Sequence, residues 1–353
     1  MMSKCLSLAT RGLGYVSPNP LVGAVLVRNG RVLARGYHRR FGGPHAEVEC
    51  IRSHRGSFAD TTLYVNLEPC VHVGKTPPCT RFIISKRIPR VVVAMRDPNS
   101  LVAGRGISAL RRAGIKVTVG ILENEATELN REFVTHIVRR WPYIHMKVAQ
   151  TLDGKIAPHK GKRVWISSSA SRTLVHHWRA THDAVLVGVG TIIADDPILD
   201  ARLVRGRNPH AVILDGNFSI PISARVFKIA GRNVFVCVKG NVLKKQKAKA
   251  ARLERRGVVF IPIANQKQSL KPVLKKVYRY KIGSLLVEGG GKVFASFIRQ
   301  SLVDRLSVFL SPNMMGDGTP GISLHQLSQF APADLRVESI GKDILIAMNL
   351  GGT

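Results

Sequence analysis

The two stretches "PHAEVECIRSH" (44–54) and "EPCVHVGKTPPC" (68–79) decide the fold and the chemistry predicted for this chain. They hold one imidazole, one carboxylate and two thiols at short spacings: His45, Glu47, Cys70 and Cys79. Zinc in proteins prefers nitrogen and thiolate ligands, and a catalytic zinc keeps one of its four positions for water. One histidine and two cysteines leave that position free, so we predict His45, Cys70 and Cys79 as zinc ligands.

Glu47 follows the histidine by two residues and is predicted to move protons rather than to bind the metal. Zinc lowers the pKa of water toward neutrality, and a nearby carboxylate can then pass a proton to a leaving nitrogen. A His-x-Glu element followed by Pro-Cys is the signature of zinc nucleobase deaminases. We expect His45 and Pro69-Cys70 each at the beginning of a helix, because helix N-termini favour thiolates.

The spacing of the two cysteines departs from the simplest form of this signature. That form has Cys-x-x-Cys, whereas eight residues separate Cys70 from Cys79, with Pro77-Pro78 just before the second cysteine. Taken singly, each cysteine is better interpreted as a small buried residue and His45 as a core histidine. Taken together with Glu47, the four indicate a deaminase site.

Outward from these motifs, the first half of the chain alternates strand-like and helix-like segments. The hairpin signal Asn29-Gly30 lies between two apolar runs. The other predicted elements are a helix at 2–11, a helix from about 45, a strand at 62–67, a helix at 79–87, a strand at 90–95, a helix at 104–114, a strand at 115–121 and one helix over 123–140. Pro142 discourages continuation of that last helix, so we place a domain boundary there, with domains at 1–142 and 143–353.

The second half begins a new α/β alternation. We predict strands at 143–150, 184–189, 210–215, 233–238, 258–263, 284–290 and 305–312, followed by a closing hairpin, and helices at 168–181, 268–280, from 291, and in the basic run from 244. "VEGGGKVFASF" (287–297) places three glycines between a strand and a helix, a geometry in which backbone N–H groups can approach a phosphate. It is not G-x-G-x-x-G, and such turns often serve packing alone.

Composition limits the classes of function. The net charge of +32 invites a nucleic-acid interpretation, but the excess is +13 in residues 1–143 and +19 in residues 144–353, so it is not clustered. A general basic bias, or attraction of anionic substrates, explains it better. Five cysteines are an odd number and are few for a chain of 353 residues, which argues against a disulfide framework. No apolar run reaches membrane-spanning length and no secretory signal is visible, so a cytoplasmic enzyme is expected.

A family resemblance covers nearly the whole chain. It is carried by "SPNPLVGAVLV", "GPHAEVE", "EPCVHVGKTPPC" and "DPNSLVAGRGISALRRAGI", and then by "KVAQTLDGKIA", "WISS", "TIIADDPILDAR" and "LLVEGGGKV". Together these segments resemble the bifunctional riboflavin-biosynthesis deaminase–reductase. The resemblance implies a cytidine-deaminase-like α/β/α domain followed by a dihydrofolate-reductase-like α/β domain.

The same resemblance implies a two-step activity with two cofactors. The expected steps are hydrolytic deamination of 2,5-diamino-6-(5-phosphoribosylamino)pyrimidin-4-one, then reduction of the ribose of 5-amino-6-(5-phosphoribosylamino)uracil to a ribityl chain. One zinc ion per chain would serve the deaminase domain and NADPH the reductase domain. The implied partner is thus a small phosphoribosyl-pyrimidine, with no nucleic acid and no membrane, and a homo-oligomer is expected.

The resemblance also implies roles for individual residues. Asn19 would contact the pyrimidine, although turn chemistry explains it equally, and His72 and Lys75 in the inserted loop would meet substrate. Residues expected at the dinucleotide are Gln150, Trp165, Thr191, Asp195, Gly216, Gly290, Gly291, Lys292, Val293, Phe294, Ala295 and Ser296. Residues expected at the second substrate are Arg163, Arg179, Leu199, Arg202 and Glu288. Lys147, Asp195 and Glu288 are the charged candidates for catalysis.

Three of these positions depart from the family pattern. Gln150 and Gly216 stand where relatives often carry a small residue and a serine, and Arg163 replaces a small polar residue. Without the motifs, Arg179 would be interpreted as a surface residue, Asp195 as a turn cap and Trp165 as core.

Two other functions stay open. One domain could be active and the other only structural, or the chain could be a base deaminase that binds RNA, as its charge suggests. A non-enzymatic basic binding protein does not explain the His/Glu/Cys spacing.

Overall fold

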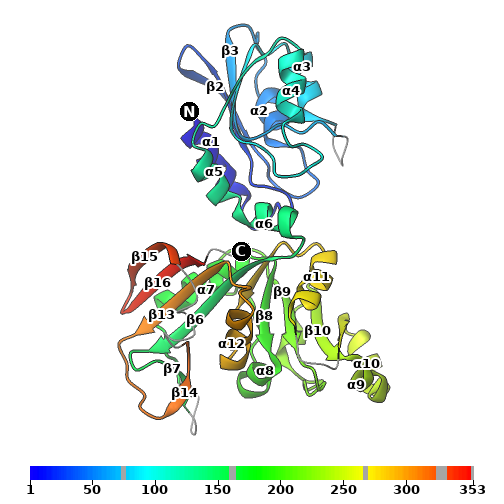
Figure 1. Cartoon of the computed structure of the whole chain (residues 1–353), viewed down its shortest axis with the longest axis vertical. Coiled ribbons are helices and arrows are strands. Elements are labelled where there is room, and N and C mark those ends of the chain that lie inside the picture. The colour runs from blue at the N-terminus through cyan, green and yellow to red at the C-terminus, as the bar shows by residue number, and fades with distance from the viewer. Residues whose placement is uncertain (73–76, 159–163, 265–268, 323–331, 351–353) are drawn as a thin grey trace. The chain divides into compact units, whose positions relative to one another are not determined.

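The computed structural model describes residues 1–353 except 73–76, 159–163, 265–268, 323–331 and 351–353 (Figure 1). The chain forms two compact units, Met1–Trp141 and Pro142–Thr353. In the part of the chain that is described, no helix has the length and apolar character needed to cross a bilayer.

The first unit is built on a mixed sheet, whose five described strands have the order β2-β1-β3-β4-β5. Their bounds are β1 (Gly23–Arg28), β2 (Arg31–Tyr37), β3 (Thr61–Leu67), β4 (Arg90–Met95) and β5 (Lys116–Val119). The β1–β2 hairpin turns at Asn29 and Gly30, both with positive φ, as the sequence predicts. β3, β4 and β5 run parallel, so their carboxyl ends meet at one edge.

Helices cover both faces of this sheet. Figure 1 shows α1 and α5 on one side and α2, α3 and α4 on the other. The bounds are α1 (Met2–Ala9), α2 (Ala46–Arg52), α3 (Cys79–Ser85), α4 (Arg105–Arg112), α5 (Glu123–Leu129) and α6 (Arg131–Arg139), with a 3-10 turn at Thr10–Gly12. The core between these layers is aliphatic, with Leu26, Leu63 and Ile83 fully buried.

The single helix predicted over 123–140 is wrong, because Asn130 divides it into α5 and α6. Asn130 leaves helical geometry at φ −101° and ψ 16°. Its buried side chain accepts a hydrogen bond from the Leu21 N–H at 2.7 Å and donates one to the Leu21 carbonyl at 3.0 Å. This pairing with a distant backbone segment ends α5 and gives α6 a new direction.

The second unit is built on a larger sheet, in which the described strands have the order β11-β10-β9-β8-β12-β6-β13-β16-β15. The strands from β11 to β13 are parallel, and β16 and β15 add an antiparallel edge, which is the predicted closing hairpin. Their bounds are β6 (Tyr143–Thr151), β8 (Ala184–Gly188), β9 (His210–Leu214), β10 (Val234–Lys239), β11 (Val258–Ile263), β12 (Ser284–Val287), β13 (Arg305–Ser311), β15 (Pro332–Ile340) and β16 (Asp343–Leu350).

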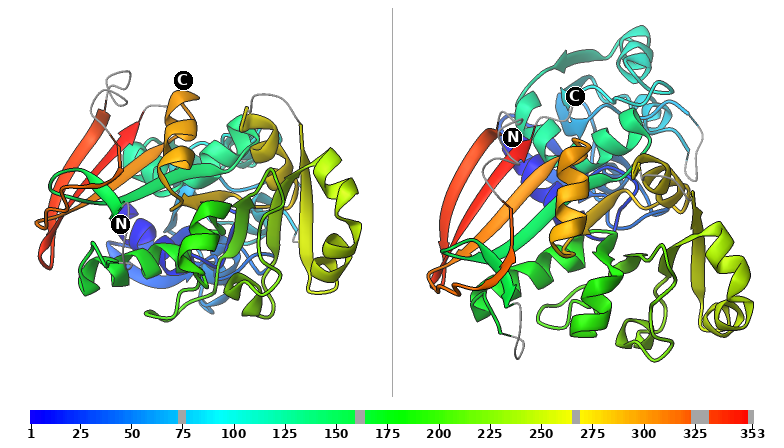
Figure 2. Two further views of the ribbon diagram at one scale, coloured as in Figure 1. Left: turned by 90° about the horizontal axis from the view of Figure 1, so that it is seen from below. Right: turned by 60° about the horizontal axis from the view of Figure 1, so that its bottom comes forward.

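Helices lie on both faces of the second sheet as well. Figure 2 shows the gold α11 and the orange α12 on one face and the green α7 on the other. The bounds are α7 (Ser169–Thr181), α8 (Val189–Asp195), α9 (Gly240–Lys245), α10 (Lys247–Glu254), α11 (Lys271–Arg279) and α12 (Gly291–Arg299), with a 3-10 turn at Arg225–Lys228.

Four features of this unit differ from the sequence prediction. The basic helix is two helices, because Gln246 leaves helical geometry (φ −113°, ψ 43°) where α10 turns to bury Ala250 and Leu253. The strand predicted over 284–290 ends at Val287. Helix α8 was not predicted, and neither was the small ribbon of β7 (Lys155–Pro158) and β14 (Gly318–Pro320).

Candidate functional site

The predicted metal ligands of the first unit converge on one point. The Nδ1 atom of His45 lies 3.2 Å from the Cys79 sulfur and 3.6 Å from the Cys70 sulfur. All three ligand atoms lie within 4.8 Å of one another. Donors sharing a tetrahedral zinc stand about 3.5–4 Å apart, given its usual bond lengths. The donor set and its spacing therefore fit a zinc ion with one position open.

Each ligand is positioned by the end of a regular element. His45 is the N-cap of α2, in an extended conformation, and Cys79 is the first residue of α3. Cys70 lies in the loop after β3, so the expectation that Pro69-Cys70 begins a helix is wrong. The helix begins nine residues later, where the Cys79 N–H points at the Cys70 sulfur at 3.4 Å. The helix therefore begins at the second cysteine of the motif and not at the first.

The two thiols cannot both ionise without a nearby cation. Hydrogen bonding from Cys79, with a further contribution from His45, lowers the pKa of Cys70 to about 4. The same bond, together with burial, raises the pKa of Cys79 well above its usual range. A divalent cation would relieve this conflict, because it stabilises both thiolates at once.

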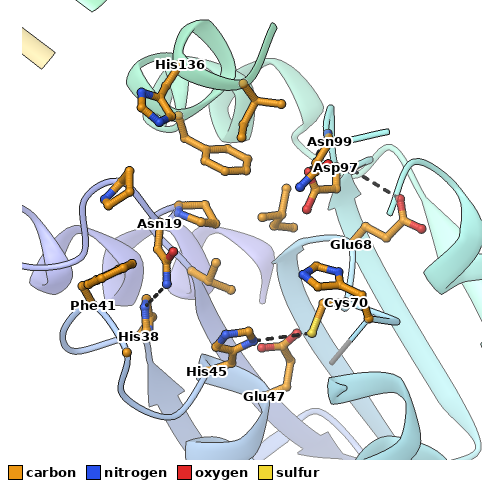
Figure 3. A pocket seen from close by; sticks show the side chains of 18 of the residues that line it. Asn19, His38, Phe41, His45, Glu47, Glu68, Cys70, Asp97, Asn99 and His136 are labelled. Atoms are coloured by element: carbon orange, nitrogen blue, oxygen red, sulfur yellow. Dashed lines mark hydrogen bonds between the residues drawn. The ribbon is translucent and has the colours of Figure 1, made fainter. Parts of the chain in front are cut away.

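Glu47 lies beside this cluster in the first turn of α2 and is 4% exposed (Figure 3). Burial raises the pKa of its carboxyl to about 7, and His45 opposes that effect. A carboxyl with a pKa near the operating pH is suited to proton transfer in both directions.

The metal cluster opens into a pocket of about 330 Å³ (Figure 3). Its walls come from the loop before β1, the loop before α2, the ends of β3 and β4, and α6. The lining residues with polar side chains include Asn19, His38, Glu68, His72, Asp97, Asn99 and His136, and Phe41 and Phe133 supply aromatic surface. Sequence reasoning assigned Asn19 and His72 to substrate but missed His38, Asp97, Asn99 and α6. The "DPN" of the fourth motif was the available signal for two of them.

His38 fixes the orientation of Asn19. The Nδ1 atom of His38 lies 2.9 Å from the Pro44 carbonyl, and its Nε2 atom lies 3.1 Å from the Asn19 Nδ2. A carbonyl only accepts, so Nδ1 carries the proton and Nε2 accepts from the Asn19 amide. Burial lowers the pKa of His38, which keeps this neutral form. The Asn19 carbonyl oxygen is therefore left as an acceptor for an N–H group of a ligand.

Glu68 holds the segment 97–107 against the metal-ligand loop. Its buried carboxylate accepts hydrogen bonds from the backbone N–H groups of Asp97, Gly104, Gly106 and Ile107, at 2.8–3.3 Å. A Cβ added to Gly106 would stand 2.2 Å from the Pro69 carbonyl oxygen, so only glycine permits this approach. Asp97 and Asn99 reach the pocket because of this latch.

Replacing Glu68 with glutamine should loosen that segment. An amide has one acceptor oxygen and presents an NH₂ group to backbone donors, so buried N–H groups lose their partners at a cost of about 2–3 kcal/mol. Hydrogen exchange at the Gly104 and Gly106 amides should become faster by the factor that corresponds to this free energy, which is about tenfold for each 1.4 kcal/mol. Glu49→Gln, which changes an exposed ion pair with Arg39, is the matched control and should leave exchange unchanged. Equal exchange in both variants would contradict the latch.

In the second unit, Arg179 and Glu288 form a buried two-pronged ion pair. The Arg179 Nε and Nη2 atoms lie 2.6 and 2.8 Å from the two carboxylate oxygens of Glu288. Their side chains are 13% and 9% exposed. Burial alone would raise the pKa of Glu288, but Arg179 and the nearby Lys147 together hold it below its usual range.

Lys147 lies on β6 beside this pair. Burial lowers the pKa of its amine, an effect that Glu288 opposes. The ammonium also stands 5.6 Å from the centre of the Phe309 ring on the neighbouring strand. Lys147, Arg179 and Glu288 thus form one charged cluster from three elements. Asp195, the third charged candidate for catalysis, lies at the end of α8 instead.

The glycines after β12 form a cradle with the end of β8. A Cβ on Gly289 would stand 2.6 Å from the Val187 Cα, and one on Gly188 would stand 2.9 Å from Val293. Gly290 has positive φ and lies near the Thr191 hydroxyl. Gly188 and Gly289 are thus packed where no side chain fits, and this close packing joins the end of β12 to α12 beside the end of β8. A turn of this kind at the carboxyl ends of parallel strands suits a phosphate group approaching backbone N–H groups.

The predicted cofactor residues that follow the glycines lie on helix α12. Val293 and Phe294 are buried, and their N–H groups donate to the Gly290 carbonyl, while the Ser296 hydroxyl accepts from Gln300. Gly290, Gly291 and Lys292 form the cradle at the beginning of α12, and Ala295 lies further along the same helix.

Each of the remaining candidates has different surroundings. Leu199 is buried with positive φ, and Arg202 pairs with Asp200, whose carbonyl accepts from Arg179. Trp165 is 57% exposed under the Arg172 guanidinium, so core packing is excluded for it. Gln150 accepts from the Ile322 N–H, Gly216 lies against Lys239, and Asp195 ends α8. Arg163 and Lys75 lie outside the described residues.

Sequence reasoning missed His176, which is buried and lies near the charges of Arg179 and Arg202. Burial and these arginines lower its pKa to about 4, so it is neutral and accepts a hydrogen bond from the Leu203 N–H. No motif in the sequence marks it, because Arg202 and Leu203 come from a distant segment and only the fold brings them beside α7.

Comparison with known proteins accounts for both units. Residues 1–95 match the model of the cytidine and deoxycytidylate deaminase zinc-binding region, and residues 142–346 match that of the RibD C-terminal domain. Riboflavin biosynthesis protein RibD of Aquifex aeolicus is 42% identical over 349 residues, which cover 98% of this chain and 96% of that protein. The chain belongs to the RibD family.

Solved structures of RibD family members agree over the full length. The diaminohydroxyphosphoribosylaminopyrimidine deaminase/5-amino-6-(5-phosphoribosylamino)uracil reductase of Thermotoga maritima is 39% identical, with a TM-score of 0.86 and coverage of 99% of this chain and 97% of that one. RibD of Acinetobacter baumannii is 34% identical, with a TM-score of 0.88 and the same coverage.

The family membership confirms the resemblance found in the sequence. This RibD family member is a bifunctional riboflavin-biosynthesis enzyme with a deaminase domain and a reductase domain. The predicted fold class, a cytidine-deaminase-like domain followed by an α/β reductase domain, is confirmed as well.

Proposed function

We propose that the first unit hydrolytically deaminates 2,5-diamino-6-(5-phosphoribosylamino)pyrimidin-4-one, and that the second unit reduces the ribose of 5-amino-6-(5-phosphoribosylamino)uracil with NADPH. The observation that carries the first step is the convergence of His45, Cys70 and Cys79 beside the buried Glu47 in one pocket. The charged cluster of Lys147, Arg179 and Glu288 near a glycine cradle supports the second.

In the deamination step, His45, Cys70 and Cys79 would hold one zinc ion per chain. Zinc, when bound, makes hydroxide available from water at neutral pH. Glu47 takes the proton released from that water and delivers it to the amino group that leaves as ammonia. Asn19, oriented by His38, accepts a hydrogen bond from the pyrimidine, and Asp97 and Asn99 line the same pocket.

In the reduction step, the chain's residues orient the sugar and supply a proton. NADPH provides the hydride when it is bound at the glycine cradle. Glu288 is held ionised by Arg179, so it serves as a fixed negative charge rather than as an acid. Lys147, whose pKa is lowered by burial, is the better donor to the ribose oxygen. Arg202 and Arg179 suit the sugar phosphate, because a guanidinium binds phosphate with two parallel bonds.

Purified protein supplied with zinc and NADPH should release ammonia from the diaminopyrimidine phosphate and then consume NADPH. Metal analysis should find one zinc per chain. Ammonia release with no NADPH oxidation would leave only the deaminase proposal standing. NADPH oxidation that occurs only when the deaminated intermediate is supplied would leave only the reductase proposal.

The alternative of an RNA-binding base deaminase is not supported. It would need only the first domain, whereas the match to the RibD C-terminal domain covers most of the second. The small-molecule substrate, without nucleic acid, is therefore our proposal. We also propose self-association, supported by the exposed Leu335 and Val337 on the edge strand β15; a monomer in sedimentation equilibrium would contradict it.

A further inference from the structure

We propose that Lys239 binds the 2′-phosphate of the dinucleotide and thereby selects NADPH over NADH. The inference rests on the proposed reductase function and goes beyond it by naming the residue that distinguishes the two cofactors. Neither the motifs nor the sequence candidates include Lys239.

The strand order places Lys239 on the path of a dinucleotide. In an open parallel sheet, ligands lie along the carboxyl ends of the strands. Along this edge the sheet presents Lys147 on β6, Glu288 and the glycine cradle after β12, Gly188 at the end of β8, Gly216 after β9 and Lys239 at the end of β10. The reacting end of the cofactor belongs near Lys147 and its pyrophosphate at the cradle. Its adenosine therefore extends toward β9 and β10.

The distance along the edge is suitable. Neighbouring strands stand about 4.8 Å apart, so β10 lies about 10 Å beyond β8. The strand ends are in register, because the Lys239 N–H donates to the Gly216 carbonyl at 3.2 Å. An adenosine and an extended lysine side chain can together cover this distance.

Gly216 leaves room for the lysine side chain over the end of β9. A Cβ built on Gly216 would stand 3.4 Å from the Lys239 Cε and 3.8 Å from its Cγ, which is ordinary contact. The lysine stem therefore lies directly over a position that has no side chain of its own. A larger residue at 216 would share that space with Lys239.

The ammonium of Lys239 has capacity for an anion. In the part of the chain that the structure describes, the ammonium donates one hydrogen bond, to the Asn217 side-chain oxygen at 3.4 Å. An ammonium has three donors, so the others can bind an anion. Among the residues that the structure describes, no ion pair includes Lys239.

The carboxylate of Asp215, which lies at the same edge of the sheet, already accepts hydrogen bonds from its own loop. Enzymes that use NAD place a carboxylate on the ribose 2′-hydroxyl, whereas a basic residue accommodates the 2′-phosphate of NADP. Asp215 directly follows β9, but its two oxygens accept hydrogen bonds from Ser219 and Ile220 at 2.8–3.0 Å. A free cation beside an occupied carboxylate favours the phosphorylated cofactor.

The test is equilibrium binding of NADPH, NADH, adenosine 2′,5′-bisphosphate and 5′-AMP, measured by calorimetry on the full chain. The wild-type protein should bind NADPH more tightly than NADH, and adenosine 2′,5′-bisphosphate more tightly than 5′-AMP. Lys239→Gln should weaken both phosphorylated ligands by about tenfold to a hundredfold, since bonds to charged groups have that strength. Binding of NADH and 5′-AMP should change less than twofold, and Lys239→Arg should keep the preference.

Two further variants make the result specific. Lys342→Gln lies in the turn between β15 and β16, at the opposite edge of the sheet, and should change no affinity. Lys292→Gln, at the cradle, should weaken NADPH and NADH alike, because both carry a pyrophosphate. The inference is overturned if Lys239→Gln leaves the preference for NADPH intact, or if it weakens NADH equally. Wild type that binds neither dinucleotide would overturn the reductase proposal as well.

Discussion

The Glu47→Gln variant should lose ammonia release by about 10²- to 10⁴-fold, the range that a positioned acid–base group contributes. Glutamine has nearly the same shape but cannot take a proton from water or deliver one to the leaving nitrogen. Glu47 is buried beside the three ligand atoms and is not itself one of the grouped metal donors. The variant should therefore bind as much zinc as wild type, which metal analysis would measure.

A matched control lies on the same helix. Glu49→Gln, two residues later, changes a residue that is paired with Arg39 at the surface, and it should leave ammonia release unchanged. Reduction of supplied deaminated intermediate should proceed at the wild-type rate in both variants, because Glu47 belongs to the other compact unit. Ammonia release that persists in Glu47→Gln with full zinc would refute the assigned role.

The Arg179→Met variant should lower the unfolding free energy of the second unit by about 3–5 kcal/mol. Removing one partner of a buried ion pair leaves the other charge without compensation, and that penalty has this size. The Glu288 carboxylate is 9% exposed, so water cannot replace the guanidinium. Urea unfolding followed by tryptophan fluorescence would measure the loss, because Trp178 packs beside His145 and Phe309 in this unit.

The double variant Arg179→Met/Glu288→Leu separates stability from function. Removing both charges should recover most of the lost stability, since a buried ion pair is often no more stable than apolar residues of similar volume. NADPH oxidation should stay abolished, because the charges that orient the sugar are gone. Arg202→Met, at a half-exposed pair with Asp200, should cost less than about 1 kcal/mol. A single Arg179→Met variant as stable as wild type would contradict the burial argument.

The sequence by itself was sufficient for features that depend on local spacing. The Asn29-Gly30 hairpin and the α/β alternation follow from residues a few positions apart. The two short motifs around His45 and Cys70 also predicted a group of donors that the structure brings together. Periodicity and turn chemistry act over that range, so a single sequence displays them. The motifs of the second domain were identified through the resemblance rather than through such spacing.

Features that join distant segments were decided only by the tertiary structure. Asn130 ends a predicted helix because it pairs with Leu21, and the Glu68 carboxylate gathers four N–H groups from 97–107. Arg179 and Glu288, 109 residues apart, meet only because α7 packs beside the end of β12. Such contacts depend on the order of strands in a sheet, which places side chains together irrespective of their separation in the chain. No local pattern encodes that order. The burial and charge pairing of Arg179 and Glu288, and the position of Lys239 that supports its proposed role, therefore became visible only in the fold.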